Sequence, residues 1–202
     1  EERSTETSLS GLLEVLTGLS LKDPGIVETL GYHLQEDSAC AHKERLFLVM
    51  EKMQGTFQQF LQGDPSVDRV LNGVASVARS LLFLHAHDPM VVHLDLKCSN
   101  VLWKEQADEQ GHVVDHFKLG DFGGSWMSYQ GEAPLFLPPE EIHQRTQITP
   151  LFAPPSDEEL DHPDPSFDVY SMGVLLLEVF FGGDVVELPV GTTIRTGSSE
   201  KE

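Results

Sequence analysis

The stretch Val91–Asn100, VVHLDLKCSN, places three polar groups within six residues: the carboxylate of Asp95, the ammonium of Lys97 and the carboxamide of Asn100. A second carboxylate follows 21 residues after Asn100, in the DFG sequence Asp121–Gly123. Apolar residues lead into both segments, which indicates short buried strands beside polar loops. We expect these groups to converge. Such a set can orient a hydroxyl, hold magnesium and steady a transferring phosphate.

The pattern HxDLKxxN, followed by DFG at this separation, resembles the catalytic loop and the magnesium loop of eukaryotic protein kinases. A lone DFG occurs by chance, but the combination is specific because most positions must agree together. The resemblance implies an α+β protein-kinase-like fold, mostly the helical large lobe. It also implies transfer of the ATP γ-phosphoryl group to Ser or Thr of a protein substrate. Asp95 would orient the hydroxyl, Lys97 would contact the phosphate, and Asn100 and Asp121 would hold Mg²⁺.

Composition limits the classes of partner. The 202 residues suit one domain or slightly more, and 40% hydrophobic residues suffice for a packed core. A net charge of −20 argues against nucleic acid and anionic membranes and favours a basic peptide or protein. No apolar run approaches the roughly 20 residues of a membrane span. Cys40 and Cys98 lack metal-ligand spacing, so we expect free thiols in a reducing compartment, the cytoplasm.

The first fifty residues resemble the end of a kinase small lobe. Leucines at helical spacing predict a helix that ends near Ser20, and strands are expected at Ile26–Leu34 and Arg45–Met50. The resemblance places Glu14 where the family keeps a glutamate paired to an ATP-binding lysine, although Glu14 could be only a solvated helix residue. Thirteen residues precede Glu14, without a lysine or a Gly-rich loop. We therefore expect a kinase fragment with little activity by itself.

The segment that follows, MEKMQG, resembles the hinge between the kinase lobes. Met50 would be the gatekeeper residue, and the backbone of Glu51 and Met53 would meet the adenine of ATP. An ordinary strand end is the alternative. This interpretation divides the chain into a partial small lobe at 1–50, a hinge at 51–55, a large lobe at 56–183 and a polar tail at 184–202.

Within the expected large lobe, apolar residues at spacings of three and four predict a long core helix over Asp68–His85. The polar stretch Lys104–His116 is expected to be a surface insertion between short strands. The apolar stretch Ser166–Val179 resembles the buried helix F of kinases, and Asp168 would hydrogen-bond backbone amides of the catalytic loop or merely cap the helix. His85 and His87 are not expected to bind metal, because a third ligand at suitable spacing is missing.

Several positions depart from the family pattern. Leu94 replaces the arginine that reads a phosphate on the activation segment. We expect that segment at Gly124–Pro138, ending in the LPPE sequence Leu137–Glu140. Ala133 would then stand where Ser/Thr kinases keep a threonine that bridges the catalytic aspartate and lysine.

The expected activation segment carries three hydroxyl groups that could accept a phosphate, those of Ser125, Ser128 and Tyr129. It contains no Lys or Arg. With Leu94 in place of the arginine, a phosphate there would find no cation to bind. We therefore expect activity without activation-segment phosphorylation.

Two further interpretations remain. A pseudokinase would use the same fold as a protein-interaction module without catalysis. The absent small-lobe residues favour it, whereas the retained Asp95, Lys97, Asn100 and Asp121 argue against it. A kinase of small molecules with a similar fold is the third possibility, and the LPPE sequence and the full apolar helix offer it little support.

Overall fold

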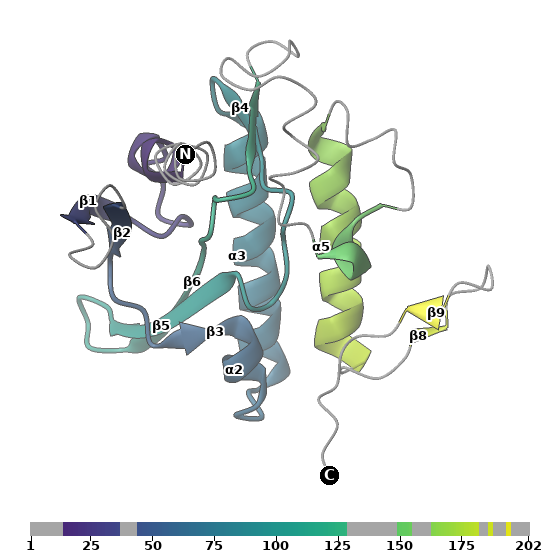
Figure 1. The fold of residues 1–202 in the computed structure, drawn as a ribbon. Coiled ribbons are helices and arrows are strands. Elements are labelled where there is room, and N and C mark those ends of the chain that lie inside the picture. Colours follow the sequence, from purple (N-terminus) through teal and green to yellow (C-terminus); the bar gives the residue numbers. More distant parts are fainter. Residues whose placement is uncertain are drawn as a thin grey trace.

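The computed structural model describes residues 14–36, 44–128, 149–154, 163–181, 186–187 and 193–194. Two long helices, α3 (Val67–Ala86) and α5 (Pro165–Phe181), run side by side through the centre (Figure 1). A three-stranded sheet packs against α3 on the side away from α5, and a two-stranded hairpin lies beyond that sheet. This mixture of helices and antiparallel strands confirms the predicted α+β class.

The three-stranded sheet has the order β3 (Gly55–Thr56), β5 (Val101–Ala107), β6 (Val113–Leu119). β5 and β6 pair antiparallel along their full length, from Val101 opposite Leu119 to Ala107 opposite Val113. The prediction of a surface insertion over Lys104–His116 is therefore wrong, because most of this stretch extends the hairpin. The prediction failed because this end of the sheet is solvated. Its strands therefore carry polar side chains and lack the alternation of apolar and polar residues that indicates a strand.

The N-terminal part consists of a helix over residues 14–20 and the hairpin β1 (Thr29–Glu36)–β2 (Glu44–Met50). The helix and both strands agree with the prediction, although β1 begins three residues later than expected. The difference arises because residues 25–27 pair elsewhere: Ile26 forms a bridge with Leu119, and the Val27 amide donates to the Leu119 carbonyl at 2.8 Å. This pairing ties the N-terminal part to the strand that leads to Asp121.

The remaining short elements flank these layers. They are α2 (Phe57–Leu61), β4 (Met90–Val92), β7 (Trp126–Ser128), the 3-10 helix η1 (Pro150–Phe152), β8 (Val186–Glu187) and β9 (Thr193–Ile194). β4 pairs antiparallel with β7, and β8 with β9. The last pair lies in the stretch predicted as a polar tail. Cys40 and the LPPE sequence lie outside the described residues.

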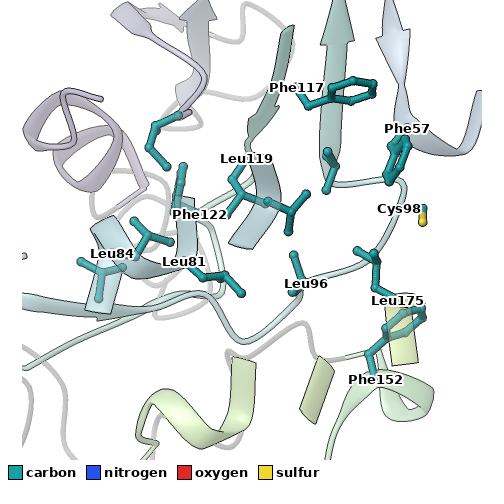
Figure 2. Packing of buried hydrophobic residues seen from close by; sticks show 14 of the residues in the cluster. Phe57, Leu81, Leu84, Leu96, Cys98, Phe117, Leu119, Phe122, Phe152 and Leu175 are labelled. Atoms are coloured by element: carbon teal, nitrogen blue, oxygen red, sulfur yellow. The ribbon is translucent and has the colours of Figure 1, made fainter. Parts of the chain in front are cut away.

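One apolar core joins the sheet to both long helices (Figure 2). Phe57 of α2 and Phe117 of β6 meet edge to face, with ring centroids 5.1 Å apart. α3 approaches these rings closely at Gly73, where an added Cβ would lie 2.9 Å from the Phe57 ring. Leu96 and Leu175 extend the same core to the loop after β4 and to α5. The polar loop that carries Asp95 is therefore anchored by its own buried leucine.

A charged cluster fastens the start of α3 to the β5–β6 hairpin. The Arg69 guanidinium donates two hydrogen bonds to the Asp115 carboxylate, at 2.6 and 2.7 Å, and a third to Glu105 at 2.9 Å. The Trp103 indole donates to the same Asp115 carboxylate at 2.9 Å. Bidentate pairs of this kind fix orientation as well as distance. Sequence reasoning did not predict them, because the partners are 46 residues apart.

No helix among the described residues is both long enough and apolar enough to cross a bilayer.

Candidate active site

The loop after β4 is held by one buried carboxylate of α5. Asp168 is fully buried and accepts hydrogen bonds from the amides of His93 at 2.8 Å and Leu94 at 3.0 Å. The His85 ring nitrogen Nε2 of α3 lies 2.8 Å from the same carboxylate. The expected bonds from Asp168 to the loop backbone are thus present, and His85 pairs with Asp168. Among the described residues, no cluster of His, Cys, Asp and Glu could hold a metal ion.

The three bonds to Asp168 stabilise a backbone conformation that is unfavourable for the residue that adopts it. Leu94 has φ of 66°, in the left-handed region that a leucine rarely occupies. Such strain costs on the order of 1–3 kcal/mol and persists only where the surroundings enforce it. The turn at Leu94 directs the next side chain, Asp95, towards the interior of the loop, where it is buried.

The Asp95 carboxylate collects the polar groups that the sequence predicted to converge. Its Oδ2 accepts hydrogen bonds from Lys97 Nζ at 2.6 Å and from Asn100 Nδ2 at 2.8 Å. Asn100 Nδ2 also donates to the Asp95 carbonyl at 2.8 Å. These bonds leave the Asn100 side-chain carbonyl oxygen without a hydrogen bond in the described part of the chain. Asp95 is therefore fixed in orientation beside a free amide oxygen.

A threonine that the sequence analysis missed completes this cluster. Thr149 Oγ1 donates to Asp95 Oδ1 at 2.6 Å, the Thr149 amide donates to the same oxygen at 3.2 Å, and Lys97 Nζ donates to Thr149 Oγ1 at 2.9 Å. Thr149 is thus the residue that bridges the aspartate and the lysine. The assignment of this position to Ala133 is wrong.

The error came from two similar sequences that both contain paired prolines. The LPPE sequence at Leu137–Glu140 was taken as the end of the activation segment, but the threonine contacts place that end near Thr149, just before FAPP at 152–155. The segment after Asp121 is consequently longer than predicted and contains Arg145. The prediction that the segment contains no cation is therefore wrong, and Leu94 alone still favours activity without a phosphate there.

Asp121 is connected to this cluster through the backbone. The Gly120 amide donates to the Asn100 carbonyl at 3.0 Å, and His93 Nε2 lies 3.0 Å from the Gly120 carbonyl. A carbonyl oxygen can only accept, so His93 donates from Nε2. The His93 ring also contacts Phe122, with centroids 5.2 Å apart. His93 was not predicted as a functional residue, yet it joins the two segments that carry Asp95 and Asp121.

Glu14 lies close to Asp121 on a small pocket. A Cβ added at Gly123 would lie 3.4 Å from Glu14 Oε2. Partial burial, and then the negative charge of Asp121, raise the pKa of Glu14. Within the described part of the chain, Glu14 forms no ion pair. The pocket is lined by Glu14, Gly18, Val27, Thr29, Leu48, Met50, Gly120, Asp121 and Phe122.

The segment after β2 presents backbone groups beside this pocket. Met50 lines the pocket itself. The Glu51 amide donates to the Glu28 carbonyl at 2.9 Å, and the Gln54 amide donates to the Trp103 carbonyl at 2.9 Å. Between these two anchors, the Glu51 carbonyl and the Met53 amide and carbonyl make no hydrogen bond with another described residue. They are therefore available to a ligand.

The Glu51 side chain is held by two lysines of the β5–β6 hairpin. Lys104 Nζ donates to Oε2 at 2.6 Å, and Lys118 Nζ donates to Oε1. Oε1 also accepts from the Glu28 amide at 2.9 Å. Partial burial alone would raise the pKa of Glu51, but these three hydrogen bonds outweigh it and hold the pKa at about 2. The carboxylate is therefore charged throughout the neutral range.

A small apolar cluster covers the strained turn from the other side. Leu94 is buried together with Trp126 of β7 and Phe167 of α5. Ala153, which follows η1, packs against the same cluster. β7 pairs with β4 at Val92 opposite Trp126. The beginning and the end of the segment that follows Asp121 are thus attached to Leu94 by apolar contact rather than by a charged pair.

Comparisons with known proteins agree with this geometry. A family model described as the protein kinase domain matches residues 2–197. The L-type lectin-domain containing receptor kinase V.5 of Arabidopsis thaliana is 28% identical over 199 residues, which cover 92% of this chain and 26% of that protein. A serine/threonine-protein kinase WNK of Caenorhabditis elegans is 30% identical over 165 residues, covering 80% of this chain and 8% of that protein. The chain thus spans about a quarter, or less, of the length of these two relatives.

Among solved structures, a chain of the yeast RNA Pol II CTD kinase CTDK-1 complex has a similar fold. The TM-score is 0.60 at 18% sequence identity, and the match covers 86% of this chain and 50% of that chain. At an identity this low, the match shows a similar fold and says nothing about function.

The contacts of Asp168 generate a stability prediction. In Asp168→Asn, the amide nitrogen cannot accept a hydrogen bond, so at least one buried donor of the loop loses its partner. We expect a loss of about 2–4 kcal/mol in the free energy of unfolding, measured by urea denaturation. Asp64→Asn is the matched control, because Asp64 is exposed and its side chain makes no hydrogen bond in the described residues; it should change stability by less than about 0.5 kcal/mol. Equal stabilities of the two variants would contradict the assignment.

The low pKa of Glu51 generates a pH prediction. The folded pKa of about 2 lies below the ordinary value of 4.5, so the stabilisation is complete above pH 4.5 and is lost as the pH falls towards 2. The stability difference between the wild type and Glu51→Gln should therefore shrink by roughly 1–2 kcal/mol between pH 6 and pH 3, measured by urea denaturation. Glu109→Gln, at an exposed turn residue, is the matched control. A difference that grows on acidification would refute the assignment.

Proposed function

Because this chain belongs to the protein kinase family, we propose that it transfers the γ-phosphoryl group of ATP to a serine or threonine hydroxyl of a protein. The observation that carries the proposal is the closed set of contacts among Asp95, Lys97 and Thr149. It supplies an oriented carboxylate and an ammonium within reach of one reacting centre.

The reaction assigns a role to each member of the set. The substrate oxygen attacks the γ-phosphorus, the bond from that phosphorus to the bridging oxygen breaks, and ADP leaves with the electron pair. Asp95 accepts the proton of the attacking hydroxyl. Lys97 contacts the transferring phosphoryl group and offsets its negative charge. Thr149 holds both side chains in place through its hydroxyl group.

Asn100 and Asp121 suit a magnesium ion, because both offer the hard oxygen donors that Mg²⁺ prefers. The Asn100 amide nitrogen is used by Asp95, which leaves its oxygen for the ion. The Asp121 carboxylate accepts no hydrogen bond from another described residue. When bound, the ion would neutralise charge on the phosphates. The backbone bond between Gly120 and Asn100 keeps the two ligand-bearing segments adjacent.

Residues 51–55 would form the hinge between a partial small lobe at 1–50 and a large lobe at 56–183, followed by a polar tail at 184–202. The adenine would lie against the free backbone groups of this segment. The Glu51 carbonyl would accept from the adenine amino group, and the Met53 amide would donate to a ring nitrogen. Met50 would limit access to the pocket that Glu14 and Asp121 line.

A pseudokinase remains the second candidate, because Glu14 has no lysine partner in the described residues. An interaction module without catalysis would not need Asp95 and Lys97 to be aligned. Their alignment therefore favours the catalytic proposal. Cytoplasmic location, a basic protein substrate and the absence of nucleic-acid binding remain expectations from the sequence.

Replacement of the second proposed metal ligand tests the proposal. Asn tolerates the left-handed backbone of Asp121, with φ of 63°, so Asp121→Asn should fold. In the whole protein we expect phosphoryl transfer to fall at least about a hundredfold, because a charged ligand of Mg²⁺ is lost. Adenosine affinity, measured by calorimetry, should stay within about twofold, because the hinge is unchanged. Transfer at the wild-type rate would show that Asp121 does not bind the metal.

The apolar cluster around Leu94 supports activity without a phosphate on the activation segment. Leu94 offers a phosphate no charge, and Trp126 already packs against it. After phosphatase treatment, verified by mass spectrometry, the whole protein should retain its rate within about threefold, or under roughly 0.7 kcal/mol of barrier. The treatment covers Ser125, Ser128 and Tyr129 together. A hundredfold loss that rephosphorylation restores would contradict the prediction and would point to Arg145 as the phosphate partner.

A further inference from the structure

The Glu51 carboxylate joins the segment that would bind adenine to the strand that leads to Asp121. Its two lysine partners come from different strands, Lys104 from β5 and Lys118 from β6. Lys118 lies three residues before Asp121. All three side chains are largely shielded from solvent, with exposed fractions of 13% for Glu51, 22% for Lys104 and 13% for Lys118. The three side chains therefore pack against one another rather than extend into solvent.

The two lysines require an anion between them. Lys118 lies opposite Leu102, and Lys104 follows Leu102 by two residues, so both lysines lie on one face of the hairpin as diagonal neighbours. Like charges at neighbouring positions of a sheet repel each other. Glu51 removes this repulsion by accepting a bond from each ammonium on a different oxygen. Charge-assisted bonds of this kind are short and directional, so they fix the position of the residue that carries the carboxylate.

The same carboxylate fixes its own backbone. Glu51 Oε1 accepts from the Glu28 amide, while the Glu51 amide donates to the Glu28 carbonyl, both at 2.9 Å. The backbone amide and the side chain of Glu51 are thus both held against Glu28. Its carbonyl remains free within the described part of the chain and points to no other partner there. The Glu51 side chain therefore helps to fix the position of the Glu51 carbonyl, which a ligand could use.

We propose that the Glu51 side chain is a positioning residue for adenine recognition: its bonds to Lys104 and Lys118 hold the Glu51 carbonyl in place to accept from the adenine amino group. This inference rests on the proposed function, in which the backbone of residues 51–53 meets the adenine. Glu51 makes no contact with the ligand through its carboxylate. It acts through the lysines, which also keep the adenine-binding segment at a fixed distance from Asp121.

Nucleosides that differ only in the amino group separate this role from a structural one. Purine riboside lacks the 6-amino group of adenosine, so the ratio of their dissociation constants reports the bond to the Glu51 carbonyl. In the whole protein, calorimetry should show a preference for adenosine of about tenfold, the magnitude of one well-placed hydrogen bond. Glu51→Gln should reduce the preference to less than about threefold. Glu109→Gln removes an exposed carboxylate that makes no hydrogen bond or ion pair with the described residues, so it should leave the preference unchanged.

A loss of stability alone would weaken both nucleosides equally and leave their ratio intact. If Glu51→Gln does not fold, Lys104→Met replaces it in the same measurement of the two dissociation constants. This variant removes one of the two lysine bonds to Glu51 and leaves the bond from Lys118, so it should also reduce the preference for adenosine. An unchanged preference in the folded variant overturns the inference and leaves the proposed function standing. Failure of the wild-type protein to bind adenosine at all overturns the proposed function, and the inference with it.

Discussion

The buried carboxylate of Asp168 is the constraint on which the site depends. It accepts two backbone amides of the loop and contacts a histidine of α3, so it ties together α5, α3 and the turn at Leu94. A carboxylate at this depth is costly unless its oxygens are satisfied, and here hydrogen-bond donors face both oxygens. The favourable bonds offset the strain of the left-handed Leu94 and direct Asp95 into the cluster with Lys97. Without them, the apolar packing of Leu94 and Leu96 would have to hold the loop against this strain.

Three further links build the rest of the site on this anchored loop. His93 and Asn100 each bond to Gly120 and thereby set the position of Asp121. Thr149 returns from a distant part of the chain and bonds to both Asp95 and Lys97. Each link satisfies polar groups that would otherwise be buried without partners. The same bonds that stabilise the fold therefore align the groups proposed for phosphoryl transfer, and chemistry and stability share one network.

Local patterns in the sequence predicted much of this arrangement. The spacing of apolar residues predicted α3, and an apolar stretch that resembles helix F of kinases predicted α5. The group Asp95, Lys97 and Asn100 needs little tertiary information because all three lie in one short loop. The bonds of Asp168 to the loop amides were also predicted, but from the resemblance to kinases; its position at the start of an apolar helix alone indicated only a helix cap. The predictions of α3 and of the group around Asp95 succeeded because each depends on residues close together in the sequence.

The features that were missed depend on contacts between distant segments. Thr149 is 54 residues from Asp95, and two similar proline-rich sequences competed for the same assignment. The outer half of the β5–β6 hairpin carries polar side chains, so the sequence there lacks the alternation of apolar and polar residues that predicts a strand. The lysine partners of Glu51 lie 53 and 67 residues along the chain. Charge alone could not identify them, since ion pairs leave no local pattern in a sequence.

In the proposed reaction, Asp95 is held by Lys97 and Thr149 and takes the proton of the attacking hydroxyl. The most direct test measures transfer of the γ-phosphoryl group from ATP to a protein substrate by the whole protein and by its Asp95→Asn variant. We expect a fall in kcat of at least about a hundredfold, because the proton acceptor is lost and an amide cannot accept all the bonds that Lys97 and Thr149 donate to the carboxylate. Adenosine affinity should be unchanged, because the adenine would bind at residues 51–53. Equal kcat values for the two proteins would contradict it.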